Sequence, residues 1–570
     1  MINTFPINTV PLAGALGGGS ALPVEPQYHF SWSVKVVIAG VDMTAQLTGA
    51  VEIDREEGAA GIANFSLFIY PGTPVVPTDW LNATVTIDLL ITQDSITTTE
   101  RLLTGFLAQP VWDSVNRILM CECSDNLQQR VEALGVASID GLCGGYWSAD
   151  VFEPVEGRSH WDYALERLST VRGSLDCSAT GGLRVTPWAI KPVAQVFGEG
   201  TTLYQSVSVD LAEASSITNR VEVEFSYRYR RLWQHNKKYS WLSPEAGGSA
   251  GITGFCQWRQ NSHELPTIEM IEDEARDAGE TLLSPAYHEL PPSMPNPCGD
   301  GVAWVNNQVG LLLGVEWVGA RRWAQVVTEK QPLVFTATNG DIEGKQVVQR
   351  TSYTLDIETE RAKTWESDPI LDGTSGAQDE ADEVRRRAVF DIAAQTAVTE
   401  ITAAHRRTTV SWSVPAAMAK GLDLTHTLEL NDQGVHAVGK VRRLVYSLDF
   451  DSGEALTHIS IAVMRGGGVS SAMVMPDRLG TLDPDDDDGF LPVNTLPTQL
   501  GGRPSSPAYD DELPGFAGNY SVIASGAQTY PRRIAANTDE LEAERRDEHI
   551  YTGEPAAYSV GIANNTLELL

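Results

Sequence analysis

Cysteine and positive charge are both scarce in this chain. Six cysteines in 570 residues are too few for the disulfide framework of a small secreted domain, so we expect folding in a reducing cytosol with free thiols. Only 41 lysines and arginines stand against 75 acidic residues, and the net charge is −34. Because phosphate contacts need Lys and Arg, the composition argues against a nucleic-acid-binding protein. A carboxylate-lined channel would still let a duplex pass without sticking.

Long apolar runs are also missing. No stretch of about 18 apolar residues occurs, so no membrane-spanning helix is expected. Met1–Pro6 has no basic region followed by an apolar core, which argues against a secretory signal. The glycine-rich Leu12–Ser20 is typical of a flexible arm. The length is enough for roughly three or four domains with packed cores.

What the chain does contain is a series of short strands between Ser31 and Gln129. Val34 and Val36 alternate with polar residues, and similar alternation recurs around Phe65 and Ile87. Turn residues separate these runs, which predicts antiparallel strands with one buried face, arranged as a small barrel or sandwich. Asp125 is then placed to cap a helix that runs through Gln128 to Leu134.

This arrangement resembles the first domain of the tailed-bacteriophage baseplate hub family. The family includes late-control protein D-like tail proteins and the hub half of type VI secretion spike proteins. The resemblance is carried by the order and spacing of five segments: Val34–Asp42, Ala63–Leu67, Trp80 with Val85–Ile87, Leu103–Leu107, and Cys123–Leu127.

The resemblance continues along the chain to about Met464. Ser159 is expected to cap a helix from His160 to about Thr170, and a hairpin follows, as in the mixed α/β domain of the hub family. A second helix is predicted over about Glu380–Ala404. The segments that resemble a second hub barrel are Arg406–Val414, Val435–Val441 and Leu448–Thr457.

The fold class expected is therefore mainly β with α+β elements. It comprises two related antiparallel β-barrels of tail-tube type, an intervening mixed α/β domain and an extended C-terminal arm. The expected divisions are a flexible N-terminal arm (1–28), the first barrel with its closing helix (29–135), the mixed α/β domain (136–300) with an insertion at about 230–300, a β-rich segment (301–375), the helix with the second barrel (376–465), a Pro/Gly/Asp-rich linker (466–517) and a small terminal β element or docking arm (518–570).

Two sets of residues invite a metal interpretation. Cys121 and Cys123 lie two apart on a predicted strand and so share one face. A zinc or iron–sulfur site would need two further ligands nearby, so buried thiols are the simpler interpretation and the metal site remains the alternative. The acidic Asp483–Gly489 fits neither register of a calcium-binding loop and is interpreted as a solvated linker.

No catalytic residue is predicted. Cys143, in a glycine-rich segment with His160 nearby in sequence, faintly resembles a thiol nucleophile, but a turn explains the glycines equally well. His263 and Glu264 lack the second histidine of a zinc protease, and Pro266 would break the helix that such a site needs. No cofactor is therefore expected.

One cluster mixes aromatic and basic residues, Tyr227–Trp233 with Lys237 and Lys238. Such a cluster suits nucleic acid, lipid headgroups or an acidic patch on another subunit. In so acidic a protein we favour the contact with another subunit.

The resemblance implies a structural role as a phage tail baseplate hub. It implies a homotrimer whose paired barrels form a ring that adapts a sixfold tail tube to a threefold tip around the DNA channel. The implied partners are distal tail or tail-tube proteins, the tape-measure protein, and tail-tip and fibre proteins, with DNA only in transit. The implied location is the tail baseplate of the virion, assembled in the host bacterial cytoplasm.

Two alternatives remain open. One is a tail-associated cell-wall hydrolase that uses paired carboxylates, although no spacing singles out an acid and a nucleophile. The other is a receptor-binding or adhesin protein, which the aromatic content and the strand-like C-terminal residues favour.

Overall fold

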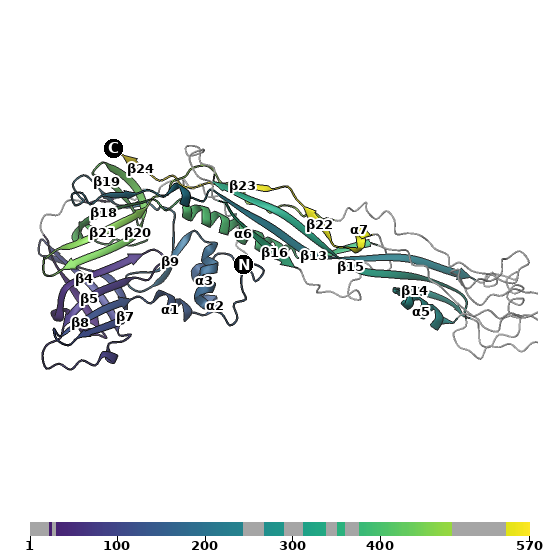
Figure 1. Ribbon diagram of the computed structural model, residues 1–570, viewed down its shortest axis with the longest axis horizontal. Helices are drawn as coiled ribbons and strands as arrows, with labels where there is room; N and C mark the ends of the chain where they lie inside the picture. Colours follow the sequence, from purple (N-terminus) through teal and green to yellow (C-terminus); the bar gives the residue numbers. More distant parts are fainter. Residues whose placement is uncertain are drawn as a thin grey trace, which may run out of the picture.

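The computed structural model describes residues 22–24, 30–242, 267–289, 312–337, 350–358, 376–481 and 543–570. The described part is mainly β, with large antiparallel sheets, which confirms that part of the expected fold class. The molecule is elongated: a strand-rich head lies at one end, and a long β-ribbon extends from it (Figure 1). None of the described helices is both long and apolar enough to cross a membrane.

The first half of the head, here called the first lobe, is built from the strands with two-residue alternation. Val34, Val36, Phe65, Leu67 and Ile87 are all buried in its core, as the alternation predicts. The hydrogen-bonded order is β2-β6-β7-β8-β5-β4. The strands are β2 (Ser31–Ile38), β3 (Val41–Asp42), β4 (Leu47–Glu56), β5 (Ile62–Phe68), β6 (Thr84–Gln93), β7 (Ile96–Asp113) and β8 (Ile118–Ser124).

The second lobe repeats this order with strands from distant parts of the chain. Its order is β11-β19-β20-β21-β18-β12, and one pairing, β11 with β19, is parallel where the first lobe has an antiparallel pair. The short β1 (Leu22–Pro23) lies beside β11. The strands are β11 (Val193–Phe197), β12 (Ser208–Asp210), β18 (Thr409–Pro415), β19 (Thr427–Asp432), β20 (Val435–Asp449) and β21 (Ala455–Ala462).

A short α/β segment lies between the lobes and the ribbon. The Ser159 hydroxyl accepts a hydrogen bond from Asp162 N and caps α3, so the helix begins at the predicted residue. Asp125, predicted to cap α1, lies one residue before the N-cap position, which Asn126 occupies, and its carboxylate accepts the backbone N–H groups of Gly61 and Leu127. The elements are α1 (Leu127–Glu132), α2 (Val136–Cys143), α3 (His160–Ser169), β9 (Gly173–Cys177) and β10 (Leu183–Pro187).

The ribbon consists of two very long antiparallel strands, β13 (Arg220–Leu242) and β15 (Leu312–Ala337), which pair from Arg220↔Thr336 to Leu242↔Gly314. Shorter strands flank them on both edges. Those on β13 are β16 (Arg350–Glu358) and β17 (Gly376–Glu380); those on β15 are β14 (Glu280–Glu289), β22 (His549–Thr552) and β23 (Ala556–Val560). The described C-terminal residues therefore run along the ribbon, and β24 (Leu567–Leu569) then pairs with β20 of the second lobe.

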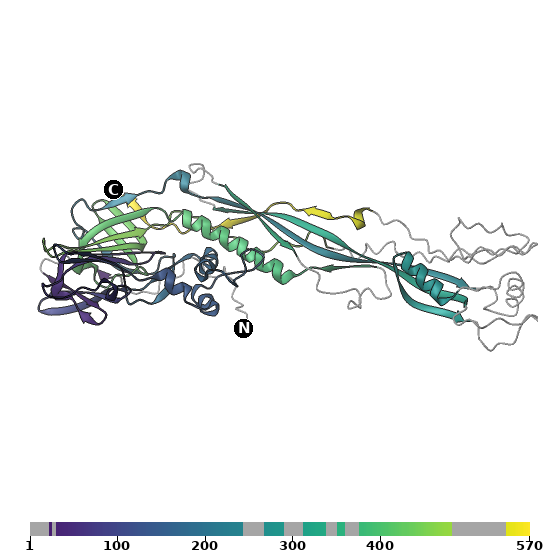
Figure 2. The ribbon, with the colours of Figure 1, turned by 60° about the horizontal axis from the view of Figure 1, so that its bottom comes forward.

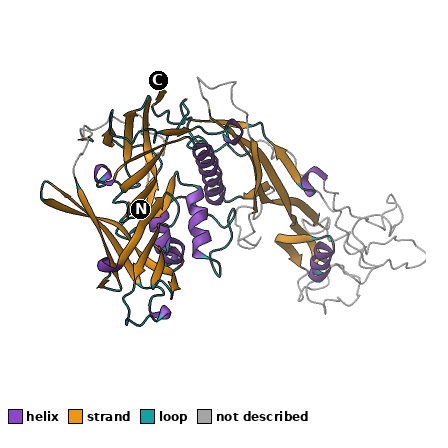
Figure 3. Ribbon diagram, turned by 60° about the vertical axis from the view of Figure 1, so that its left-hand side comes forward, coloured by secondary structure: helices purple, strands orange, loops and turns teal. Residues whose placement is uncertain are grey.

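One long helix, α6 (Glu383–Ala404), lies along the ribbon next to the head (Figure 2). Asp382 caps it by accepting the backbone N–H groups of Val384 and Arg385. The residues predicted to form its buried stripe are all buried against β13, β15 and β23: Phe390, Ala394, Ala397, Val398 and Ile401. Figure 3 shows α6 between the sheets of the head and the ribbon. The remaining helices, α5 (Ile268–Asp277) and α7 (Ala543–Arg546), lie on the ribbon.

Candidate functional site

The junction of the two lobes is the candidate assembly feature of this molecule. β4 of the first lobe pairs antiparallel with β20 of the second, from Glu56↔Arg443 to Ala50↔Asp449. Ile53 of β4 and Leu444 and Tyr446 of β20 are buried, and one hydrophobic core runs through both lobes. Two copies of one strand order are therefore joined edge to edge within a single chain.

An ion-pair cluster ties this junction to the α/β segment. Asp423, in the loop before β19, accepts hydrogen bonds from Arg55 of β4 at 2.8 Å and from Arg184 of β10 at 3.0 Å. Arg184 also bonds Asp176 of β9 at 2.8 Å. Burial by itself raises the pKa of Asp423, but the two guanidinium groups outweigh it and hold that pKa well below its usual range.

A second buried cluster lies at the same junction. Glu57, which directly follows β4, pairs with Lys440 at the bend of β20 and with Arg406 after α6, the latter at 2.5 Å. The three side chains are at most 10% exposed. Because an unpaired buried charge is costly, these pairs fix the lobes and the end of α6 in one arrangement.

Two glycines at equivalent places show how closely the lobes correspond. A Cβ atom on Gly105 of β7 would stand 2.5 Å from Ser124 O, and one on Gly439 of β20 would stand 2.5 Å from Ala462 O. Each glycine is followed two residues later by the bulge at which its long strand changes partner register. The same close backbone approach thus occurs twice, at matching positions.

A charged clamp holds the chain after the second lobe against the ribbon. Arg231 of β13 bonds Asp379 of β17 at 2.7 Å, and Arg478 bonds the same carboxylate. The backbone N–H of Gly480 donates to Glu329 of β15 at 3.1 Å. The segment up to Leu479–Gly480 is therefore part of the packed ribbon rather than a free linker.

The sequence-predicted metal candidates are thiols in a dry core. Cys121 and Cys123 lie on β8 and share its buried face, as predicted. Burial raises the pKa of both thiols, that of Cys121 to about 12. Among the described residues, no group of three His, Cys, Asp or Glu side chains is placed to hold a metal ion. The acidic run 483–489 and the His263–Pro266 segment lie outside the described residues.

Cys143 has the environment of a core residue. It ends α2 and packs in a cluster with Tyr163 of α3. Burial raises the pKa of its thiol to about 11, the opposite of what a nucleophile at neutral pH requires. His160 is the first residue of α3.

The aromatic and basic cluster is largely used inside the ribbon. Tyr227 and Tyr229 are buried against α6, and Arg231 is held by Asp379. The Trp233 ring stacks on Trp323 with centroids 6.1 Å apart. These four residues of the cluster therefore serve the ribbon's own packing, whereas Arg230 and Lys238 of the cluster are exposed.

Sequence reasoning missed the ribbon. Past Arg230 the apolar alternation gives way to polar residues, and the segment resembled an insertion; yet β13 continues to Leu242. Gln234 and Lys237 are buried there, where partners within the ribbon replace a hydrophobic core.

Comparisons with known proteins give distant structural likenesses only. No protein-family model matches the sequence, and no curated protein matches it. Among solved structures, a tail protein from Neisseria meningitidis MC58 aligns at 8% identity and a TM-score of 0.38, over 76% of this chain and 96% of that one. The 43 kDa tail protein of prophage MuSo2 from Shewanella oneidensis aligns at 11% and 0.35, over 76% and 98%. A Francisella PdpA–VgrG complex aligns at 8% and 0.30, over 76% and 52%.

Proposed function

We propose that this protein is the structural baseplate hub of a phage tail. In this proposal three copies form a ring whose six lobes match a sixfold tail tube on one face, while the threefold chain symmetry matches the tail tip on the other. The observation that carries the proposal is the repeated strand order, joined edge to edge through β4 and β20. The sequence resemblance to hub proteins over the same segments supports it.

The charge of the chain suits the channel of such a ring. A net charge of −34 repels DNA, so a duplex in transit would not bind the wall. The long ribbon projects away from the lobes and offers contacts with further tail proteins (Figure 1). Tail-tube or distal tail proteins, the tape-measure protein, and tip or fibre proteins are the partners we propose, in a virion tail assembled in the bacterial cytoplasm.

The role proposed is structural rather than enzymatic. The burial of Cys143 and the raised pKa of its thiol support a structural place for this residue over a nucleophilic one. The hydrolase alternative is tested by a zymogram on cell-wall material, and the adhesin alternative by binding of the purified protein to whole cells. Clearing in the first or binding in the second would move the assignment to that class.

The direct test is electron microscopy of the purified protein together with its mass by light scattering. We expect a particle of three chains with six lobes around a central opening. The same protein mixed with tail tubes should cap one end of each tube. A single chain that neither forms rings nor binds tubes would overturn the proposal.

A further inference from the structure

The in-chain junction provides a template for the contact between copies. Matching the lobes strand by strand places β12 where β4 stands, and the second half of β7 where β20 meets β4. The bulges set the register: Leu107 and Gln109 of β7 face Cys123 and Glu122, as Val441 and Arg443 of β20 face Ile461 and Ser460. Residues Gln109–Asp113 thus correspond to Arg443–Ser447.

The position of β12 follows from the same comparison of residues that face each other on neighbouring strands. Ile53 of β4 faces Ala63, which faces Cys123; Val209 of β12 faces Val410, which faces Ile461. Val209 is therefore the counterpart of Ile53. By the same offset Asp210 is the counterpart of Asp54.

Both counterpart edges are open. Within the described residues, β12 pairs only with β18, and β7 beyond its bulge pairs only with β8. In the template, by contrast, each corresponding edge is filled, since β4 and β20 fill each other. Open edges of this kind add a further strand readily.

We infer that the open edge of β12 in one copy pairs antiparallel with residues Gln109–Asp113 of β7 in the next copy. This inference rests on the proposed function, because three copies joined in this way alternate in-chain and between-chain junctions around one ring. The contact joins the β12 edge of one copy to the β7 edge of the next, so it is a head-to-tail contact. Such contacts produce closed rings when the rotation from one copy to the next closes.

The side chains of β12 fit a covered position. Val207, Val209 and Leu211 alternate along the segment, and Leu211 is 60% exposed. Val207 and Val209 are only partly buried and pack against the core, whereas their counterparts in β4, Val51 and Ile53, are fully buried in it. The apolar side chains of this segment are therefore less covered than those at the equivalent place in β4.

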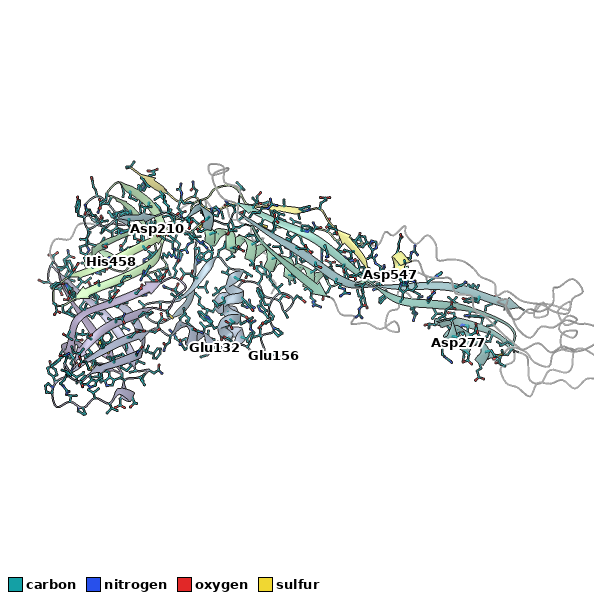
Figure 4. All side chains as sticks on the ribbon, in the orientation of Figure 1. Glu132, Glu156, Asp210, Asp277, His458 and Asp547 are labelled. Carbon is teal, nitrogen blue, oxygen red and sulfur yellow. The ribbon has the colours of Figure 1, made fainter. Side chains whose placement is uncertain are left out.

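The polar residues correspond as well. In the template, Arg443 donates to Asp54 across the strands at 2.8 Å. Gln109 and Asp210 are their counterparts, both exposed, so the Gln109 amide would donate to the Asp210 carboxylate. Figure 4 marks Asp210 on the second lobe.

Pro110 modifies the pattern without breaking it. The N–H of Glu57 donates to Arg442 O at 2.9 Å, so alternate residues Leu444 and Tyr446 turn their backbone groups to β4. The counterparts Pro110 and Trp112 then turn theirs to the open edge. Proline is tolerated there, and it would contribute its carbonyl but no N–H.

Paired cysteines test the register. Val445 faces Asp54 in the template, so Val111→Cys with Asp210→Cys should link neighbouring copies under mild oxidation, because facing Cβ atoms lie within disulfide reach. We expect a species of three chains on a non-reducing denaturing gel, lost on reduction and absent from either single variant. The matched control, Val111→Cys with Ser208→Cys, is out of register and should link far less.

Charge changes test the same contact without cross-linking. Gln109→Glu places a carboxylate near Asp210 and should shift light-scattering mass toward single chains, and adding Asp210→Lys should restore the ring; circular dichroism checks that each variant folds. A three-chain ring that gives no in-register link and ignores both charge changes would overturn this contact and leave the hub proposal standing. Single chains that neither link nor bind tail tubes would overturn both.

Discussion

Replacing Asp423 by asparagine should loosen the joint between the two lobes. The substitution keeps the size of the side chain and one acceptor oxygen but removes its charge. Arg184 keeps Asp176 as an ion-pair partner, whereas Arg55, only 4% exposed, loses the carboxylate that it contacts at 2.8 Å. The cost therefore falls mainly on Arg55.

The size of the effect follows from that burial. Removing one partner of a buried ion pair costs about 3–5 kcal/mol, because the remaining charge is left without compensation. Asp423 is 22% exposed, which admits some water. Glu100 also lies close enough to interact with the charges of Arg55 and Asp423. We therefore expect the lower end of the range, about 3 kcal/mol.

Hydrogen exchange of peptides from β4 and β20 measures this loss locally. A loss of about 3 kcal/mol corresponds to roughly a hundredfold faster exchange in these strands. Asp54→Asn, in the same strand, is the matched control: it breaks the exposed Asp54–Arg443 pair and should cost at most about 1 kcal/mol. Equal effects of the two substitutions would refute the argument that burial of Arg55 sets the cost.

Three further predictions concern pH, packing and thiols. Because the pKa of Asp423 is lowered in the folded state, the Asp423 carboxylate contributes its full stabilisation above the unfolded pKa of about 3.9, and this stabilisation fades as the pH falls. Urea titrations should therefore show that the difference in unfolding free energy between wild type and Asp423→Asn shrinks below about pH 4 and stays constant above it. Gly105→Ala and Gly439→Ala each drive a Cβ against a carbonyl oxygen and should lower the free energy of unfolding by about 1–3 kcal/mol, which thermal denaturation would show as a lower melting temperature. Gly141→Ala, with open space around it in α2, should be neutral or slightly stabilising. Equal losses at all three sites would contradict this reasoning. The four cysteines among the described residues are all buried, and burial raises the pKa of Cys121 to about 12. They should resist iodoacetamide until the protein unfolds, as peptide mass spectrometry would report. Rapid labelling of these four in the native protein would count against a closed core.

The elements with a local signal were the predictable ones. Val34 and Val36 lie on one buried face because two-residue alternation is a property of a single strand. Ser159 caps α3, and Phe390 lies on the buried stripe of α6, because a cap and a helical period are likewise contained within a few residues.

What depends on distant partners could not be predicted. Nothing near Asp423 in the sequence indicates that Arg55 and Arg184 meet it, because the fold alone brings the three together. The pairing of β4 with β20 is of the same kind. The continuation of β13 was missed for a related reason: Arg231 is buried only because Asp379, far along the chain, neutralises it.

The open edge of β12 was predictable only in part. The alternation of Val207, Val209 and Leu211 is visible in the sequence, but it does not distinguish a covered strand from an open edge. Only the equivalent pairing in the other lobe identifies what is left open.

The late position of β22, β23 and β24 in the chain has a consequence for biosynthesis. While the ribosome is still making the residues before His549, the edge of β15 that β22 and β23 will fill is exposed. The start of β20 likewise waits for Leu567–Leu569. An unfilled edge is a template for unwanted pairing, so a nascent chain is vulnerable until these strands emerge. Closure of this edge of the ribbon therefore waits until His549–Val560 have been synthesised.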